Sequence, residues 1–377
     1  MARSWDVFCA VVDNFGDIGV TWRLARQLVA EHHQQVRLWV DDLDAFARLC
    51  PQADVRASRQ TQAGVEIRHW EAQWESVEPA DVVVEAFACR LPADFEVAMA
   101  RRAVPPLWLN LEYLSAEGWV AGCHRLPSLQ PNGLSKYFFF PGFDADTGGL
   151  LRERELLARR RAFQADPLAR RAFLQGLGID VAANERLVSL FSYEQPALGD
   201  WLQPLVDQQP PTRLMVPEGR VLPDLKAWLG VDALRAGDCV TRGRLTVQVL
   251  PFVSQAAYDT LLWCCDLNGV RGEDSFVRAQ WAGQPLIWHI YPQDDEAHMH
   301  KLEAFLDRFC VGLEPGLADD LRGVWRAWNR AEAPGPAWSA LLAQLSALRA
   351  HAERWCVALA EQDDLASQLV AFAARQG

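Results

Sequence analysis

The sequence predicts an α/β protein made of two doubly wound halves. Apolar, β-branched runs such as Val7–Val12 alternate with amphipathic stretches, and the alternation begins again after a polar stretch at Asp180–Arg186. Continuous apolar runs suit strands that are covered on both faces, as in a parallel sheet. Strands that alternate with helices are typical of doubly wound domains. A length of 377 residues fits two domains of ordinary size.

The first half is expected to open with a strand, a polar loop and a helix. The strand covers residues 7–12, the loop is Asp13–Gly19, and the helix runs over Val20–Glu31. Apolar periodicity then predicts a second helix over Leu43–Cys50. Further strands are predicted over residues 36–40, 65–68, 82–86 and 107–111.

An arginine-rich helical segment at residues 150–180 separates the two halves. Asp166 is expected to cap a helix in which Pro167 takes the first position. We expect the arginines of this segment to lie on a solvated helix face. The second series has an apolar strand around residues 263–267, a helix over 276–281 and a last helix from about 345 to 375. Its other strands are predicted over residues 187–191, 214–216, 245–250 and 285–291.

The charge balance argues against two classes of partner. The chain has 37 Lys and Arg against 49 Asp and Glu, a net charge of −12. Binding to nucleic acid or to an anionic membrane needs a basic surface, so neither is expected. The sequence has no run of eighteen apolar residues, so no membrane span is predicted. The apolar run before Asp13 is too short for a signal sequence. We therefore expect a cytoplasmic protein.

No metal site is expected from the sequence. Nine scattered cysteines without a C-x-x-C pair fit reduced thiols better than disulfides or zinc ligands. Asp294 and Asp295 precede His298 and His300, but their spacing fits no zinc motif. A solvated helix start explains these four residues more simply.

The first loop carries two carboxylates in place of a phosphate-binding motif. Gly16 and Gly19 let the backbone approach a ligand closely, but the loop is not G-x-G-x-x-G. Asp13 and Asp17 would repel a pyrophosphate, so the loop better suits a general base or a grip on a cation. The alternative is that Asp17 caps the helix that starts near Gly19. Spacing alone leaves both interpretations open.

A second group of polar residues, Arg271–Ser275, opens a helix after a strand. Backbone N–H groups at a helix start bind anions, and Arg271 can add a bidentate contact to a phosphate. Glu273 and Asp274 can accept hydrogen bonds from sugar hydroxyls. The alternative is a capping box, in which Asp274 or Ser275 caps the helix and Arg271 pairs with an acid.

Aromatic residues recur at the ends of the predicted strands in the second half. Singly, each is more often packing than a base clamp, but an aromatic face can stack on a pyrimidine. Together with an anion-binding helix start, they predict a nucleotide site. The residues are Phe191, Tyr193, Phe252, Tyr258 and Tyr291.

Two segments give the sequence a specific resemblance. Residues Val12–Ala25 read VDNFGDIGVTWRLA, and residues Arg271–Gly283 read RGEDSFVRAQWAG. They resemble the two signatures of the bacterial protein-arginine rhamnosyltransferases that mature elongation factor P, the EarP family. The resemblance extends over the whole chain, including the strand end at Leu190–Tyr193.

The resemblance implies a GT-B fold, with two Rossmann-like domains that face each other across a cleft. The N-terminal domain would cover residues 1–183 and be completed by a returning C-terminal helix at about 361–377; the C-terminal domain would cover 184–360. The donor would be dTDP-β-L-rhamnose, bound mainly by the C-terminal domain. The acceptor would be one loop arginine of elongation factor P, modified with inversion and without metal or cofactor. The modified factor would then rescue ribosomes stalled at polyproline.

The resemblance also assigns roles to residues. Asp17 becomes the general base, and Asp13 holds the guanidinium or positions Asp17. Glu273 is essential, with its role open between sugar hydroxyls and turn geometry. Arg271 and the N–H groups around Asp274 and Ser275 stabilise the leaving diphosphate.

The remaining donor-binding residues line the nucleotide pocket or the first loop. Phe252 is the residue expected to stack on thymine. The others are Phe191, Tyr193, Gln255 and Tyr291 in the pocket, and Asn14, Phe15 and Gly16 in the loop. Two alternatives remain: a GT-B transferase with a small-molecule acceptor, and a non-catalytic scaffold that binds a nucleotide sugar.

Overall fold

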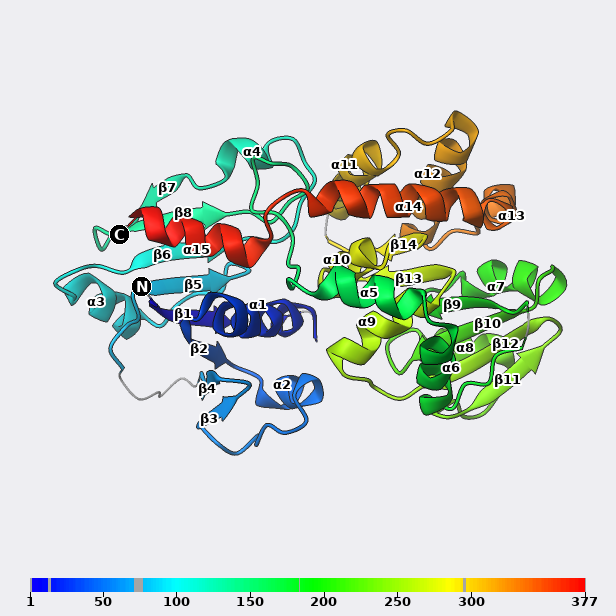
Figure 1. Cartoon of the computed structure of the whole chain (residues 1–377), viewed down its shortest axis with the longest axis horizontal. Coiled ribbons are helices and arrows are strands. Elements are labelled where there is room, and N and C mark those ends of the chain that lie inside the picture. Colours follow the sequence, from blue (N-terminus) through cyan, green and yellow to red (C-terminus); the bar gives the residue numbers. More distant parts are fainter. Residues whose placement is uncertain (1, 13–14, 71–76, 183, 294–295, 377) are drawn as a thin grey trace. The chain divides into compact units, whose positions relative to one another are not determined.

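The computed structural model describes residues 2–12, 15–70, 77–182, 184–293 and 296–376. The chain forms two compact units, Met1–Arg154 with Leu359–Gly377, and Glu155–Ala358 (Figure 1). We call them the N-terminal and the C-terminal unit. Each has a parallel-dominated sheet with helices on its faces, so the doubly wound α/β prediction is confirmed.

The sheet of the N-terminal unit has the order β3-β4-β2-β1-β5-β6-β8-β7 within the described residues. Its inner strands are parallel, and the edge strands β3 and β7 pair antiparallel. The apolar run of β5 is buried at every position, as expected for a strand covered on both faces. The strands are β1 (Ser4–Cys9), β2 (Gln35–Val40), β3 (Arg59–Gln62), β4 (Val65–His69), β5 (Val82–Ala86), β6 (Leu107–Leu111), β7 (Pro127–Leu129) and β8 (Ser135–Phe139).

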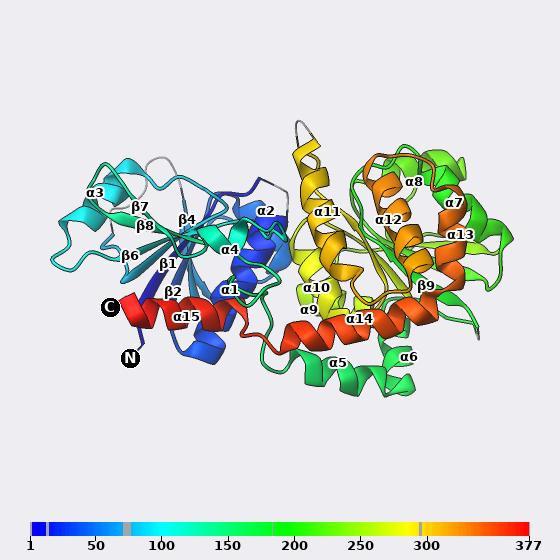
Figure 2. The same cartoon turned by 90° about the horizontal axis from the view of Figure 1, so that it is seen from above.

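Helices cover this sheet on both faces. On one face α1 and α15 pack side by side, and Ile18, Leu28 and Phe372 share a core with Val7 (Figure 2). On the other face Phe95 of α3 joins a second core cluster. The helices of this unit are α1 (Gly16–His32), α2 (Leu43–Leu49), α3 (Ala93–Arg101), α4 (Val120–Cys123) and α15 (Leu365–Gln376).

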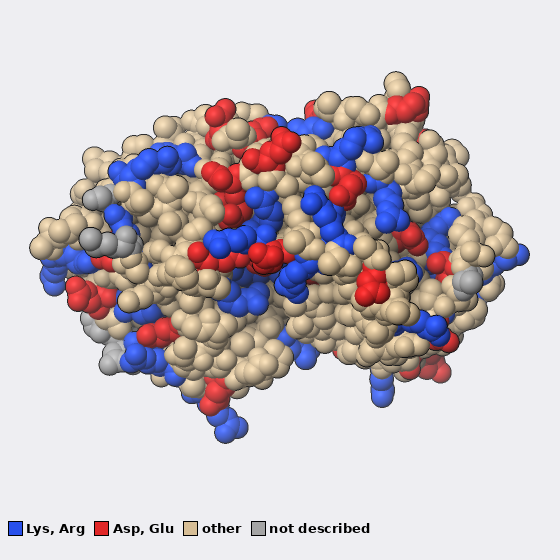
Figure 3. Space-filling view, in the orientation of Figure 1, with Lys and Arg blue, Asp and Glu red and all other residues tan. Residues whose placement is uncertain are grey.

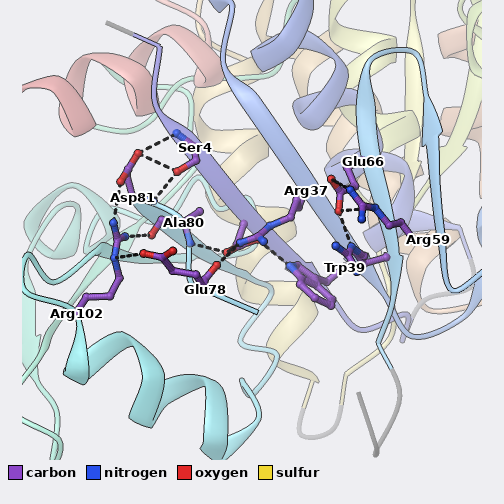
Figure 4. Close-up of polar contacts among 11 residues, drawn as sticks. Ser4, Arg37, Trp39, Arg59, Glu66, Glu78, Ala80, Asp81 and Arg102 are labelled. Carbon is purple, nitrogen blue, oxygen red and sulfur yellow. Dashed lines mark hydrogen bonds and ion pairs between the residues drawn. The ribbon is translucent and has the colours of Figure 1, made fainter. Parts of the chain in front are cut away.

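Polar contacts fix the register where β1, β2 and β5 begin (Figure 4). The buried carboxylate of Asp6 accepts hydrogen bonds from Arg37 at 2.6 and 2.7 Å, from Trp39 Nε1 at 2.9 Å and from the Ala80 N–H at 2.8 Å. Asp81 accepts from the backbone N–H of Ser4 at 3.1 Å. These bonds join residues that are far apart in the sequence, so they hold the strand starts together.

The sheet of the C-terminal unit has the order β11-β12-β10-β9-β13-β14 in the described part of the chain. Only the edge strand β11 is antiparallel to its neighbour among these pairs. The carboxyl ends of the five parallel strands therefore lie at one edge. The strands are β9 (Arg186–Leu190), β10 (Thr212–Pro217), β11 (Cys239–Arg242), β12 (Leu245–Leu250), β13 (Leu267–Arg271) and β14 (Leu286–His289).

From Glu155 onward, the arginine-rich segment packs in the C-terminal unit. Asp166 caps its second helix by accepting from two backbone N–H groups, as predicted. Arg160 is 1% exposed and pairs with Glu353 at 2.6 Å, so the expectation of a solvated face was wrong for this residue. The helices are α5 (Leu156–Gln164), α6 (Pro167–Gly176), α7 (Leu198–Asp207), α8 (Leu222–Leu229), α9 (Gln255–Cys264), α10 (Asp274–Ala282), α11 (Ala297–Phe309), α12 (Pro315–Asn329), α13 (Gly335–Ala343) and α14 (Leu345–Ala360).

Several predicted bounds differ from the structure: the strand expected over residues 7–12 is β1 at Ser4–Cys9, and the helix expected from Val20 starts at Gly16. The helix predicted from about 345 to 375 is two helices, because Asp364 accepts from the N–H groups of Ala366 and Ser367 and starts α15 anew. The apolar residues at 263–267 are not one strand, since Trp263 lies in α9 and β13 begins at Leu267. The domain boundary expected between residues 183 and 184 stays a prediction; by packing, α5 and α6 lie with the C-terminal unit.

The charged surface and the hydropathy of the helices can be compared with the expectation that the protein binds neither nucleic acid nor membranes. Acidic and basic side chains are interspersed over the face drawn in Figure 3. Among the described helices, none combines the length and the hydropathy of a membrane-crossing segment.

Candidate active-site residues

In the N-terminal unit, Asp17 lies beyond the carboxyl end of β1, where doubly wound sheets bind their ligands. Its side chain is 3% exposed, and Oδ2 accepts from the Val12 N–H at 2.9 Å. The neighbouring N–H of Val11 donates to Asp41 at 2.9 Å. Two carboxylates thus hold consecutive peptides of the loop, and Asp17 in the first turn of α1 lies at the positive end of that helix.

The structure shows whether Asp17 caps the helix that follows the first loop. Helix α1 starts at Gly16, earlier than predicted, and Phe15 takes the N-cap position without a side-chain cap bond. Asp17 is therefore inside the helix, and the alternative that it caps the helix is contradicted. Its carboxylate instead reaches back to the preceding loop. Asp13 and Asn14 lie outside the described residues.

The nearest thiol offers no competing nucleophile. Cys9 ends β1 and is fully buried. Burial, first of all, raises the pKa of this thiol well above its ordinary value, and the charge of Asp17 raises it further. A thiol in this state is protonated and inert. The chemistry available near the end of β1 is therefore that of the carboxylate.

In the C-terminal unit, Arg271 ends β13 and is 6% exposed. Its guanidinium lies between two aromatic rings, 4.3 Å from the centroid of Phe191 and 4.8 Å from that of Tyr193. Nη1 donates to the carbonyl of Ser192 at 3.3 Å. Planar stacking and a directed hydrogen bond give this guanidinium a defined orientation.

The turn from β13 into α10 is held by hydrogen bonds to its backbone. The Arg271 N–H donates to Ser275 Oγ at 3.0 Å, and that hydroxyl donates to the Arg271 carbonyl. Gly272 adopts a left-handed φ of 60°, and its carbonyl accepts from Trp288 Nε1 at 2.7 Å. Glu273 occupies the N-cap position without a side-chain cap bond, so the expectation that Asp274 or Ser275 caps was wrong.

Most of the predicted pocket residues gather at this same sheet edge. Phe191 contacts Tyr258 edge-to-face at 5.8 Å, and Tyr193 contacts Tyr291 at 5.7 Å. Gln255 donates to Asp274 at 3.4 Å. Tyr193 is 2% exposed, so it forms the wall behind Arg271, whereas Tyr291 is 40% exposed. Phe252 follows the end of β12 on the same edge and is half-buried.

Four residues of this edge were not predicted from the sequence. Arg220 follows β10, lies 5.2 Å from the Tyr193 ring and pairs with Glu194 at 2.8 Å. This hydrogen bond lowers the pKa of Glu194. Ser192 and His289 contact each other at 2.8 Å. Their position at strand ends was the available signal, but none belongs to a motif.

Another cavity lies away from these residues. It has a volume of about 660 Å³ and opens at the strand-start edge of the N-terminal unit, beside Ser4, Gln35 and Arg102. Arg102 pairs there with Asp81 at 3.1 Å (Figure 4). Since doubly wound sheets bind ligands at the opposite edge, we do not assign the chemistry to this cavity.

No metal centre is found in the part of the chain that the structure describes. No group of three or more His, Cys, Asp or Glu side chains in these residues is arranged to hold an ion. Asp294 and Asp295, of the possible metal group in the sequence, lie outside the described residues. Arg271, which ends β13, directly precedes the turn into α10.

A family model described as "Elongation-Factor P (EF-P) rhamnosyltransferase EarP" matches residues 5–374. The chain belongs to the EarP family. The resemblance seen in the sequence is thereby confirmed. A protein-arginine rhamnosyltransferase of Pseudomonas putida is 61% identical over 372 residues, which is 99% of this chain and 99% of that protein.

Solved structures agree with the EarP family and with its fold. A chain in the structure described as "Structural basis for EarP-mediated arginine glycosylation of translation elongation factor EF-P" is 44% identical, with a TM-score of 0.71 and 99% coverage of both chains. MurG of Acinetobacter baumannii covers all of both chains with a TM-score of 0.51 and 15% identity, which shows the fold alone. The predicted GT-B fold is confirmed.

The two EarP signature segments each follow an inner strand of a sheet. The first, Val12–Ala25, connects β1 to α1 and contains Asp17; the second, Arg271–Gly283, connects β13 to α10. Each joins the carboxyl end of an inner strand to the start of the next helix. Loops at the carboxyl ends of parallel strands are where doubly wound sheets bind their ligands.

Proposed function

We propose that this protein transfers L-rhamnose from dTDP-β-L-rhamnose to the guanidino group of one arginine of elongation factor P, in the cytoplasm, and so prepares the factor to rescue polyproline-stalled ribosomes. The observation that carries the proposal is membership of the EarP family over residues 5–374. The buried carboxylate of Asp17 and the oriented guanidinium of Arg271 supply chemistry that suits such a reaction.

The C-terminal unit binds the donor in this proposal. Arg271 and the backbone N–H groups at the start of α10, near Asp274 and Ser275, receive the diphosphate. Arg220 adds a second positive charge beside Tyr193. The half-buried rings of Phe191 and Phe252 are suited to the thymine base, with Gln255 and Tyr291 at the margin of this group.

The N-terminal unit supplies the base. A guanidinium has a pKa above about 12 and is a poor nucleophile until it loses a proton. Asp17 orients the acceptor nitrogen and takes the proton as the C–N bond forms and the bond between the sugar and the diphosphate breaks. Asp13 and Glu273 are further proposed catalytic residues, with Asp13 near the guanidinium and Glu273 near the sugar or the turn.

Inversion follows if a single displacement occurs, because the acceptor attacks the face opposite the departing dTDP. The leaving diphosphate gains negative charge in the transition state. Arg271 and the positive end of α10 can stabilise that charge, and such electrostatic stabilisation is the largest contribution in many enzymes. We therefore propose a reaction that needs no metal ion.

The deciding experiment incubates the purified protein with elongation factor P and dTDP-β-L-rhamnose. Intact-mass analysis should show one added deoxyhexose on the factor, mapped to one arginine, and NMR of the product should show the inverted anomer. Turnover of the donor with an unmodified factor would favour a small-molecule acceptor. Donor binding without turnover would favour a non-catalytic scaffold.

A further inference from the structure

His289 connects the two strand-end loops that carry the donor-binding residues. It ends β14 and is 6% exposed. Its Nδ1 lies 2.8 Å from the hydroxyl of Ser192, which follows β9. Its backbone carbonyl accepts from the Gly272 N–H at 3.2 Å, in the turn after β13. One buried residue thus contacts both loops.

Ser192 passes this constraint to Arg271. Its hydroxyl contacts His289, and its carbonyl accepts from Arg271 Nη1 at 3.3 Å. Because both groups belong to one residue, fixing the Ser192 side chain also limits the direction of its carbonyl. Phe191 and Tyr193, on either side of it, provide the rings that enclose the Arg271 guanidinium.

The surroundings of His289 keep the imidazole neutral. Burial, first of all, and then the charge of Arg271 lower the pKa of His289 to about 3. Its ring packs edge-to-face on Tyr193 at 5.2 Å and on Trp328 at 5.8 Å. A neutral imidazole can hold Ser192 without placing beside the Arg271 guanidinium a second cation that would repel it.

We propose that His289 is a positioning residue for the donor: through Ser192 it holds the Arg271 guanidinium in the orientation that receives a diphosphate. This inference rests on the proposed function, in which Arg271 binds the diphosphate of the donor. Loss of the His289–Ser192 contact should therefore weaken donor binding, and not only lower the stability of the fold.

The test compares two substitutions of similar shape. Asn can place a polar atom near the position of Nδ1 and keep the bond to Ser192, whereas Leu cannot. His289→Leu and Ser192→Ala should weaken dTDP binding about tenfold, the effect of one lost hydrogen bond beside a charged group. His289→Asn should stay within about threefold of the wild type, because the bond is kept.

His351→Leu is the matched control for a merely structural histidine. His351 is also buried, in α14, and its Nε2 contacts the carbonyl of Phe309. Its replacement should lower the melting temperature and leave dTDP affinity unchanged. Calorimetric titration with dTDP and thermal unfolding of all variants give both quantities.

Hydrogen exchange supplies a readout that does not depend on the donor. In His289→Leu the amides of Arg271 and Gly272 should exchange faster than in the wild type and in His289→Asn. The inference is overturned if His289→Leu keeps both wild-type affinity and wild-type exchange. It is also overturned if the Leu and Asn variants lose affinity equally. A wild type that binds no dTDP contradicts the proposed function instead, and the exchange comparison still tests the His289 contact.

Discussion

Asp17 is the residue on which the proposed proton transfer depends. Asp17→Asn leaves an oxygen that can still accept from the Val12 N–H, so the loop should keep its fold. The amide cannot take a proton, and removing a general base costs about 10²–10⁴-fold in rate. We therefore expect transfer to elongation factor P to fall by about this factor while dTDP affinity is unchanged. Intact-mass kinetics and calorimetry measure the two.

Asp41→Asn is the control for Asp17. Asp41 holds the adjacent Val11 N–H through its carboxylate, is exposed and should retain that contact as Asn. Transfer should stay near the wild-type rate. Loss of dTDP binding in Asp17→Asn, or equal loss of transfer in both variants, would mean that the carboxylate of Asp17 is structural.

Arg271 tests whether shape matters as well as charge. Arg271→Lys keeps the positive charge but loses the flat guanidinium between Phe191 and Tyr193. A lysine is not equivalent at a stacked or bidentate site, so the KM for the donor should rise by about tenfold or more. Arg242→Lys is the matched control, since Arg242 stacks on Trp228 at 4.8 Å in an exposed position. An unchanged donor KM in Arg271→Lys would contradict the assigned contact.

At the level of the elements, one buried carboxylate holds the strand starts of the N-terminal sheet together. Asp6→Ala leaves the guanidinium of Arg37 and the N–H groups of Trp39 and Ala80 without their acceptor. Breaking a buried ion pair in this way should lower the free energy of unfolding by about 3 kcal/mol. Urea unfolding followed by circular dichroism measures it.

Arg59→Ala provides the comparison for Asp6→Ala. The pair between Arg59 and Glu66 is on the surface, with Arg59 64% exposed. Such pairs contribute below about 1 kcal/mol, so the midpoint should hardly move. Similar losses in the two variants would contradict the view that burial decides the energy of these pairs.

The elements that the sequence predicted are those with continuous apolar runs. Strands β5, β6 and β12 have the predicted bounds, because nearly all of their residues are buried and most of these residues are apolar. The short, largely polar edge strands β3 and β11 were missed, since pairing rather than sequence defines them. Ser192 and His289 were missed because only the order of β9, β13 and β14 in the sheet brings them into contact. Arg271 was predicted because it belongs to a run of polar residues at a helix start.

At the scale of the whole molecule, the proposed reaction relies on cationic side chains rather than on a metal ion. Arg271, Arg220 and the start of α10 supply the positive charge for the diphosphate. We expect full transfer activity after dialysis against EDTA, measured by the intact mass of elongation factor P. An absolute requirement for added Mg²⁺ would contradict the metal-free proposal. A fall in rate with rising salt is expected in either case.

The response of the fold to pH should depend on its buried histidines. Burial lowers the pKa of His289 from 6.5 to about 3 and that of His124 from 6.5 to about 4, and it also lowers that of His351. Below pH 6.5 the unfolded chain therefore binds protons that the folded chain does not. The stability that depends on these neutral histidines is therefore fully present above about pH 6.5 and is lost as the pH falls towards their folded-state pKa values.

His289 allows this pH effect to be measured for one group. Because His289 stays neutral in the fold, the free energy of unfolding should be about 2 kcal/mol lower at pH 5 than at pH 8. His289→Leu removes the titrating group, so the difference in melting temperature between wild type and variant should shrink between pH 7.5 and pH 5. Calorimetric scans at each pH measure that difference directly. A difference that stays constant over this range would mean that His289 takes up a proton as readily in the folded as in the unfolded chain. The inference that a neutral imidazole holds Ser192 would then be wrong.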